Sequence, residues 1–135
     1  MEKLTLKFKR IEVTRVDTRD NVLEMLFYYD ENGAEKSYRK NHSIDDDVDT
    51  FVSRMMHEVK TKAYEGNAVM VDDDDFLSYH LNVLIEEKEP GVTKDKIANA
   101  IRRFKDKVRS FRSMKSSEGY MTHYHELIGL KANID

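Results

Sequence analysis

The sequence predicts an α+β fold in which an antiparallel sheet packs against two helices. Much of residues 1–42 alternates apolar and polar side chains, a period of two that is typical of β-strands. Residues 43–66 and 93–115 instead repeat their apolar side chains every three to four positions, as amphipathic helices do. Strands that come in runs, rather than in strict alternation with helices, favour an antiparallel sheet with helices on one face. The length of 135 residues fits one domain, so we expect these elements to share one core.

Residues 1–42 are expected to form a three-stranded β-meander. The apolar residues from Leu4 to Phe8 lie at every second position, and the alternation slips at Arg10, which predicts a β-bulge there. Asn32–Gly33 predicts the turn of a hairpin, because both residue types tolerate positive φ. The strand after this turn, 34–41, is mostly polar, so we expect it at an edge of the sheet.

The first helix, expected within 43–66, has an aspartate-rich segment at its start, Asp45–Asp49. These carboxylates suit a helix N-terminus, both as caps and because they face the positive end of the helix dipole. The helix is expected to end at Gly66. Its apolar side chains share one face and are Val48, Phe51, Val52, Met55, Met56, Val59 and Ala63. The second helix, 93–115, is expected to follow a break in the chain at Pro90–Gly91, and its apolar residues recur with a period near 3.5.

Two segments have a weaker pattern. Residues 67–89 are predicted to form a second hairpin, because apolar and polar residues alternate from Leu77 to Ile85 and the segment is rich in β-branched residues. A helix over 76–88 is the alternative, since several apolar residues would then share a face and the preceding aspartates would cap it. The tail, 116–135, is expected to contain a short helix at Tyr120–Leu130.

The composition excludes several classes of protein. The chain has no cysteine, which rules out disulfides, thiolate nucleophiles, zinc fingers and iron–sulfur clusters. No apolar run approaches the roughly 18 residues that a membrane span needs, so we expect no insertion into a membrane. The first residues carry no apolar region typical of a signal peptide. We therefore expect a soluble, cytoplasmic protein.

The net charge of −3 conceals a strong asymmetry along the chain. Residues 43–90 hold four basic and thirteen acidic side chains, whereas residues 91–115 hold nine basic and two acidic ones. Within the second helix, four cations spaced by three, four and three residues form one stripe, which we call the predicted stripe. It consists of Arg102, Lys105, Arg109 and Arg112. Such a stripe suits the phosphates of nucleic acid or an acidic protein. The alternative is that these side chains pair with the aspartates of the same chain.

Motifs for metal binding and catalysis are missing. The runs Asp45–Asp49 and Asp72–Asp75 lack the spaced oxygen ligands and glycine of a calcium loop, and no H-E-x-x-H sequence occurs. The sequence also lacks a G-x-S-x-G elbow and the glycine-rich loops that bind phosphates of nucleotides. We therefore predict no metal, no cofactor and no catalytic residues.

Three functional hypotheses follow from these observations. The first is a non-enzymatic binding module that engages an anionic partner, above all nucleic acid, through the helix 93–115. The second is a protein–protein adaptor or small assembly subunit whose charge asymmetry drives association, with an acidic protein as partner. The third and weakest is a metal-dependent enzyme that uses the aspartates and histidines. Because helices cover one face of the predicted sheet, we also expect any homodimer to form through the sheet.

Overall fold

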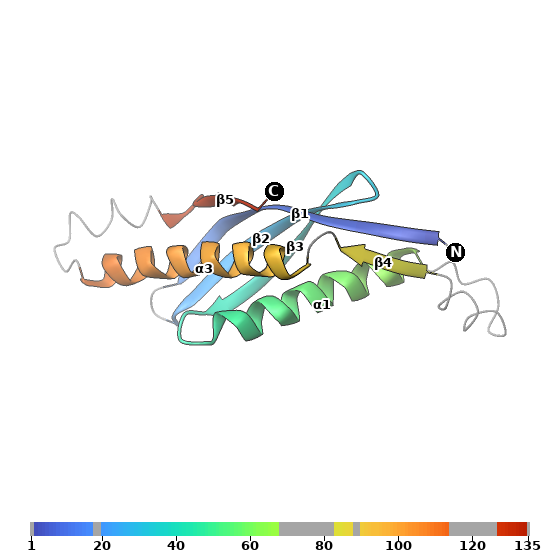
Figure 1. Cartoon of the computed structure of the whole chain (residues 1–135). Helices are drawn as coiled ribbons and strands as arrows, with labels where there is room; N and C mark the ends of the chain where they lie inside the picture. The colour runs from blue at the N-terminus through green and yellow to red at the C-terminus, as the bar shows by residue number, and fades with distance from the viewer. Residues whose placement is uncertain (1, 18–19, 68–82, 88–89, 114–126, 135) are drawn as a thin grey trace.

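The computed structural model is an α+β fold with two helices on one face of a sheet (Figure 1). The structure describes residues 2–17, 20–67, 83–87, 90–113 and 127–134. Within these ranges, the elements are β1 (Glu2–Asp17), β2 (Val22–Glu31), β3 (Ala34–Ser43), α1 (Val48–Asn67), β4 (Val83–Glu87), α3 (Pro90–Ser113) and β5 (Lys131–Asn133). Neither of the described helices is long and apolar enough to cross a membrane.

The predicted meander is confirmed. The strand order is β3-β2-β1-β4, with β5 also paired to β1, so β3 lies at the edge of the described sheet as expected. The register between β1 and β2 shifts between Phe8 and Arg10, where the sequence predicted a bulge, and again between Val13 and Arg15. Asn32 and Gly33 both have positive φ, 50° and 87°, as the predicted hairpin turn requires.

The sheet is not purely antiparallel, which corrects one part of the predicted fold. β4 pairs in parallel with Glu2–Leu6 of β1, and β5 pairs antiparallel with Arg10–Glu12 on the same edge of that strand. The parallel pair arises because the chain leaves β3 at one edge of the sheet, passes through α1 on one face, and returns to the opposite edge as β4 (Figure 1). Residues 83–87 form a strand, as the hairpin hypothesis required of them. The rest of the predicted hairpin, 68–82, lies outside the described residues.

The C-terminal tail contains a strand that the sequence did not predict, β5. Most of the helix expected at Tyr120–Leu130 lies outside the described residues. β5 has only three residues, and Ile134, which follows it, is 4% exposed and donates its N–H to the carbonyl of Lys9 at 2.7 Å. β5 is therefore held in place by its pairing with β1 and by the burial of Ile134. Its own three residues show no pattern that would predict a strand.

Both helices were predicted, with shifted starts. α1 begins at Val48 because β3 continues to Ser43, and Asp47 caps the helix by accepting the Thr50 N–H at 2.9 Å. α3 begins at Pro90, so the predicted chain break there is wrong. Proline lacks the N–H that the first helical turn leaves unbonded, and its fixed φ suits that position.

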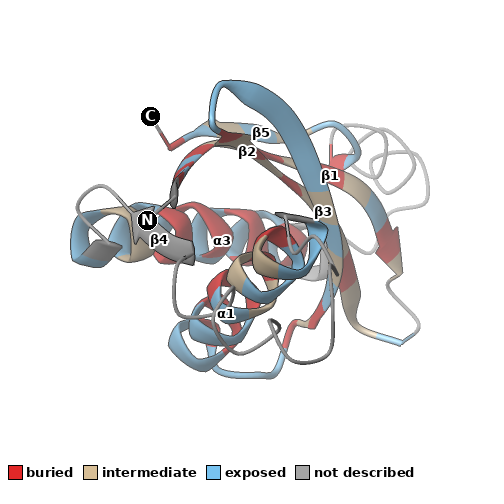
Figure 2. Cartoon of the chain, turned by 90° about the vertical axis from the view of Figure 1, so that its right-hand side faces the viewer, coloured by how far each residue is buried: buried red, intermediate tan, exposed pale blue. Residues whose placement is uncertain are grey.

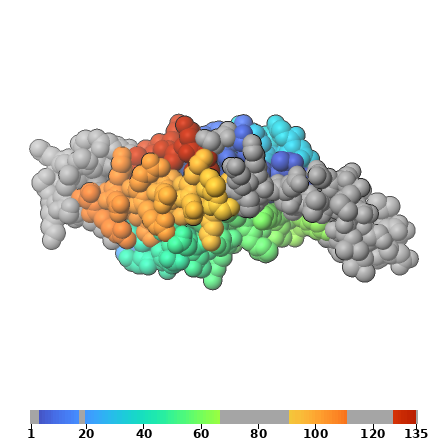
Figure 3. Space-filling model, viewed as in Figure 1, coloured from blue at the N-terminus to red at the C-terminus, as the bar shows by residue number. Residues whose placement is uncertain are grey.

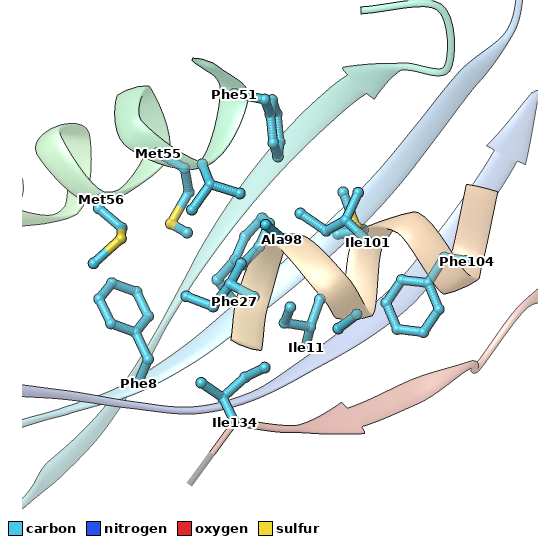
Figure 4. Packing of buried hydrophobic residues seen from close by; sticks show 14 of the residues in the cluster. Phe8, Ile11, Phe27, Phe51, Met55, Met56, Ala98, Ile101, Phe104 and Ile134 are labelled. Atoms are coloured by element: carbon cyan, nitrogen blue, oxygen red, sulfur yellow. The ribbon is translucent and has the colours of Figure 1, made fainter. Parts of the chain in front are cut away.

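The core lies between the helices and the sheet (Figure 2). The Phe27 ring of β2 lies 6.1 Å from the Phe51 ring of α1. Figure 4 shows side chains from every layer converging there, among them Phe8, Ile11, Phe27, Phe51, Met55, Met56, Ala98, Ile101, Phe104 and Ile134. The opposite face of the sheet is polar and partly exposed, and on it the Arg10 guanidinium lies 4.0 Å from the centre of the Tyr28 ring. The helix face of the sheet therefore carries the core.

Candidate functional site

Helix α3 lies between α1 and β5, and its outer surface is exposed between them (Figure 3). We call the surface toward α1 the α1 side and the surface toward β5 the β5 side. The α1 side contains Arg102, Lys105 and Arg109 of the predicted stripe. These side chains border a cleft of about 330 Å³ together with Asp46 and Asp47. The side chain of the fourth member, Arg112, lies outside the described residues.

Arg102 is paired with the aspartate-rich segment. Its Nη2 donates to Oδ2 of Asp49 at 2.9 Å, and its Nη1 donates to the Asn99 side-chain oxygen at 3.1 Å. The Arg102 and Asp49 side chains are both about half exposed, so the pair is screened by water. Its main effect is to neutralise the charge of Arg102 locally.

Lys105 is buried, with 5% of its surface exposed. Its ammonium donates to the backbone carbonyl of Asp46 at 2.9 Å and so joins α3 to the turn before α1. Burial lowers the pKa of Lys105, and the charge of Arg109 lowers it further, whereas the carboxylates of Asp45, Asp46 and Asp47 oppose the shift. Because Lys105 is enclosed, it is placed to hold the two helices together rather than to contact a partner.

Arg109 is the most exposed of the three described members of the predicted stripe. Its guanidinium lies 3.3 Å from Asp106, one turn earlier in the same helix, and both side chains are more than half exposed. Arg109 therefore stays open to solvent. The structure thus divides the predicted stripe into two residues held by the aspartate-rich segment and one that faces water.

The β5 side carries a second set of cations, Lys96, Arg103 and Lys107. All three are exposed, and none has a hydrogen bond or ion pair to another described residue. At 3.6 residues per turn, they lie within about 40° of one another around the helix axis. Lys96 and Arg103 border a groove of about 470 Å³ together with Asn99, Asn133 and Ile134. Lys96, Arg103 and Lys107 are seven and four residues apart in the sequence. Because this spacing places residues on one side of a helix, it is the signal that could have identified this set.

His42 is a further residue, which no pattern in the sequence singled out. It lies near the end of β3, is 1% exposed, and neither ring nitrogen has a hydrogen-bond partner in the described part of the chain. Its ring centre is 4.4 Å from that of Phe51. Burial lowers the pKa of His42 to about 4, and the nearby charge of Lys105 acts in the same direction, so the imidazole is neutral at pH 7.

Within the described ranges, no group of three or more His, Asp or Glu side chains is arranged to hold a metal ion. The run Asp72–Asp75 lies outside those ranges, as do His80, His123 and His125. Asp47, in the other aspartate run, is occupied as the cap of α1, where its carboxylate accepts two hydrogen bonds from Thr50. These bonds lower the pKa of Asp47.

The chain matches no known protein-family model, and no curated protein or solved structure is significantly similar to it.

Proposed function

We propose that this chain is a small non-enzymatic binding module that engages an anionic partner through the β5 side of α3. The observation that carries the proposal is the stripe formed by Lys96, Arg103 and Lys107, which are exposed and have no partner among the residues that the structure describes. On the α1 side, by contrast, a partner would compete with Asp49 for Arg102 and could not reach Lys105. Binding on the β5 side therefore requires less desolvation and less rearrangement of existing contacts than binding on the α1 side.

Nucleic acid is the anionic partner that this geometry suits best. From Lys96 to Lys107 the helix rises about 16 Å, over which it meets several phosphates of one strand. Three cations that each neutralise one phosphate give a log–log salt slope near −3 on duplex DNA. The described residues present no set of base-reading side chains in a known recognition motif, so we expect weak sequence preference and a Kd of roughly 10–100 μM at physiological salt.

A pair of double variants tests the proposal. Arg103→Gln with Lys107→Gln removes two charges from the β5 side, and Arg102→Gln with Arg109→Gln removes the same number from the α1 side. We expect the first variant to weaken binding of a mixed-sequence DNA duplex by about tenfold or more and to reduce the salt slope by about two. The second variant is expected to bind almost as the unmodified chain does. Fluorescence anisotropy over a salt series measures both quantities.

Three results would contradict the proposal. Equal losses in the two variants would show that only net charge matters. A larger loss from the α1-side variant would return the interaction to the predicted stripe. Absence of binding even at about 0.01 M salt, where charges are least screened, would rule out nucleic acid.

A protein–protein adaptor is the second candidate function. It is supported by the contacts that Arg102 and Lys105 each make with the aspartate-rich segment of the same chain. Those contacts join a basic helix to an acidic turn within one chain. In an assembly subunit, basic and acidic surfaces of two different chains would attract each other in the same way. Self-association through the face of the sheet opposite the two described helices belongs to this hypothesis. Sedimentation of a stable oligomer that DNA does not affect would favour it over the first.

A further inference from the structure

The groove between α3 and β5 has no carboxylate among the described residues that line it (Figure 3). Its walls consist of Lys96, Asn99, Arg103, Asn133 and Ile134. The groove beside β3 and the cleft on the α1 side are different, because both contain Asp46 and Asp47. The volume of the α3–β5 groove, about 470 Å³, lies within the usual range for ligand pockets. An anion can therefore enter it without meeting a negative side chain from its described walls.

A contact with Arg102 fixes the direction in which the Asn99 carboxamide faces. Nη1 of Arg102 donates to Oδ1 of Asn99 at 3.1 Å, and a guanidinium can only donate, so the carboxamide oxygen points toward Arg102. Around the helix axis, Arg102 lies about 60° from Asn99 toward the α1 side, and Arg103 lies about 40° from it in the opposite sense. The amide nitrogen, on the other arm of the carboxamide, therefore faces Arg103 and the groove.

The α3 wall of the groove thus presents hydrogen-bond donors. Lys96 supplies an ammonium, Arg103 a guanidinium and Asn99 the N–H groups of its amide. Neither cation has a hydrogen bond or ion pair to another residue in the described part of the chain. The two carboxylates of α3, Asp95 and Asp106, do not line the groove. A wall of this kind suits an oxyanion that accepts several hydrogen bonds at once.

The β5 wall adds further donors. The N–H of Ile134 bonds to the carbonyl of Lys9 on β1. Because main-chain groups alternate between the two edges of an antiparallel strand, those of the preceding residue, Asn133, face away from β1. The Asn133 side chain is exposed, and its carboxamide can donate as well. The groove therefore offers N–H groups from both of its walls.

A phosphate monoester matches this donor set better than a phosphate within a nucleic-acid strand does. At pH 7 a monoester carries about 1.5 to 2 negative charges and has three terminal oxygens that accept hydrogen bonds. A phosphate within a strand carries about one charge and has one accepting oxygen fewer. An arginine can bind two oxygens of a phosphate at once, which leaves the third for another donor.

From this geometry we propose that the groove between α3 and β5 is a pocket for a phosphate monoester, the group carried by a phosphorylated strand end and by small phosphate compounds. Arg103 binds two of its oxygens, Lys96 neutralises its charge, and the Asn99 amide donates to the third oxygen. This assignment rests on the proposed function, since Lys96 and Arg103 also belong to the stripe on the β5 side. It adds which group of the partner the stripe prefers.

The test compares two versions of one mixed-sequence DNA duplex, whose strands end either in a phosphate or in a hydroxyl. We expect the full chain to bind the phosphate-ended duplex about fivefold or more tightly, as measured by fluorescence anisotropy. Inorganic phosphate alone is titrated by NMR and should shift the side-chain amide signals of Asn99. Much weaker binding of inorganic phosphate than of the phosphate-ended duplex identifies a strand end as the source of the group. Equally tight binding identifies a small phosphate compound, and either result supports the pocket.

Two variants locate the phosphate. Asn99→Ala should reduce the preference for the phosphate-ended duplex by about threefold or more, without changing the affinity for the hydroxyl-ended duplex. Arg103→Lys keeps the charge, and with it the salt slope, but loses the contact with two oxygens, so it should reduce the preference as well. Asn41→Ala is the matched control, because Asn41 is an exposed carboxamide on β3, and it should leave the preference unchanged. Thermal unfolding checks that each variant is folded.

The results separate this pocket from the proposed function. Equal binding of the two duplexes, with no shift of the Asn99 signals, would overturn the pocket, whereas a retained salt slope of about −3 would leave the proposed function intact. An unchanged preference in both Asn99→Ala and Arg103→Lys would overturn the pocket as well. Absence of duplex binding, with Asn99 signals that still respond to inorganic phosphate, would overturn the proposed function and support the pocket.

Discussion

The two sides of α3 carry similar numbers of cations but differ in what those cations can do. On the α1 side, Arg102 and Lys105 are engaged by the aspartate-rich segment. On the β5 side, Arg103 and Lys107 face solvent without a partner among the described residues. The difference comes from the neighbour: the turn before α1 brings carboxylates and carbonyls to one side, whereas β5 contributes no acidic residue to the other. A cation is available to a partner only where the fold leaves it without an internal one.

The largest effect is expected at Phe51, an aromatic residue of the core that α1 contributes. Phe51 is 8% exposed and its ring contacts those of Phe27 and His42, so Phe51→Ala leaves a cavity between α1 and the sheet. We expect the free energy of unfolding to fall by about 3–5 kcal/mol in urea denaturation. Val92→Ala is the control, because Val92 is half exposed at the start of α3, and its effect should stay within about 0.5 kcal/mol. A loss below about 1 kcal/mol for Phe51→Ala would show that α1 is not part of the core.

Two lysines that lie two positions apart on α3 are expected to differ in how much their replacement lowers stability. Lys105→Glu places a negative charge in a buried position beside Asp46, and we expect a loss of about 3 kcal/mol in the free energy of unfolding. Lys107→Glu makes the same change in charge on the exposed β5 side and should alter stability by no more than about 0.5 kcal/mol. Similar losses for both variants would contradict the distinction between the two sides.

Acid should lower the free energy of unfolding of the chain through His42. Its pKa is about 4 in the folded chain and near 6.5 when unfolded, so the unfolded chain binds more protons between these values. The stabilisation is complete above pH 6.5 and is lost as the pH falls toward 4, by about 3 kcal/mol in total. His42→Leu removes the titrating group, and its stability should vary less over this range. Parallel pH profiles for the variant and the unmodified chain would show that His42 does not titrate in this way.

The smallest effect is expected for the surface ion pair. Arg102→Ala breaks the contact with Asp49, but both side chains are about half exposed, so we expect a loss of at most about 1 kcal/mol. The loss should shrink further at high salt, since exposed charges are screened. A loss that does not respond to salt would mean that Arg102 acts through packing rather than charge.

The sequence predicted the parts of the fold that depend on local pattern. The alternation around Leu4–Phe8, the bulge at Arg10 and the turn at Asn32–Gly33 all appear where they were expected. The parallel pairing of β4 and the existence of β5 depend on which distant segments meet, and a strand of three residues carries no measurable period. Those features could not be predicted from the residues that form them.

The candidate site was predictable only in part, for a related reason. Helical spacing placed Arg102, Lys105 and Arg109 on one side of α3, and the structure brings these three to one cleft. Spacing does not show which segment packs beside a helix, so it could not distinguish the enclosed Lys105 from the exposed Arg103. The burial of His42 was hidden in the same way, because its surroundings come from α1 and α3 rather than from β3.

The pairing of β5 with β1 also bears on the order in which the chain folds. Lys131 to Asn133 are synthesised after every other described element, yet they pair with Glu12 to Arg10 in the first strand. Closing so long a loop costs conformational entropy before the contact returns any stability, so this pairing forms late. Until then, the edge of β1 opposite β2 lacks Ile134 over its apolar side chains. The meander and α1 can assemble during synthesis, whereas the β5 side of α3, where we place the anionic partner, is complete only when the last strand has joined the sheet.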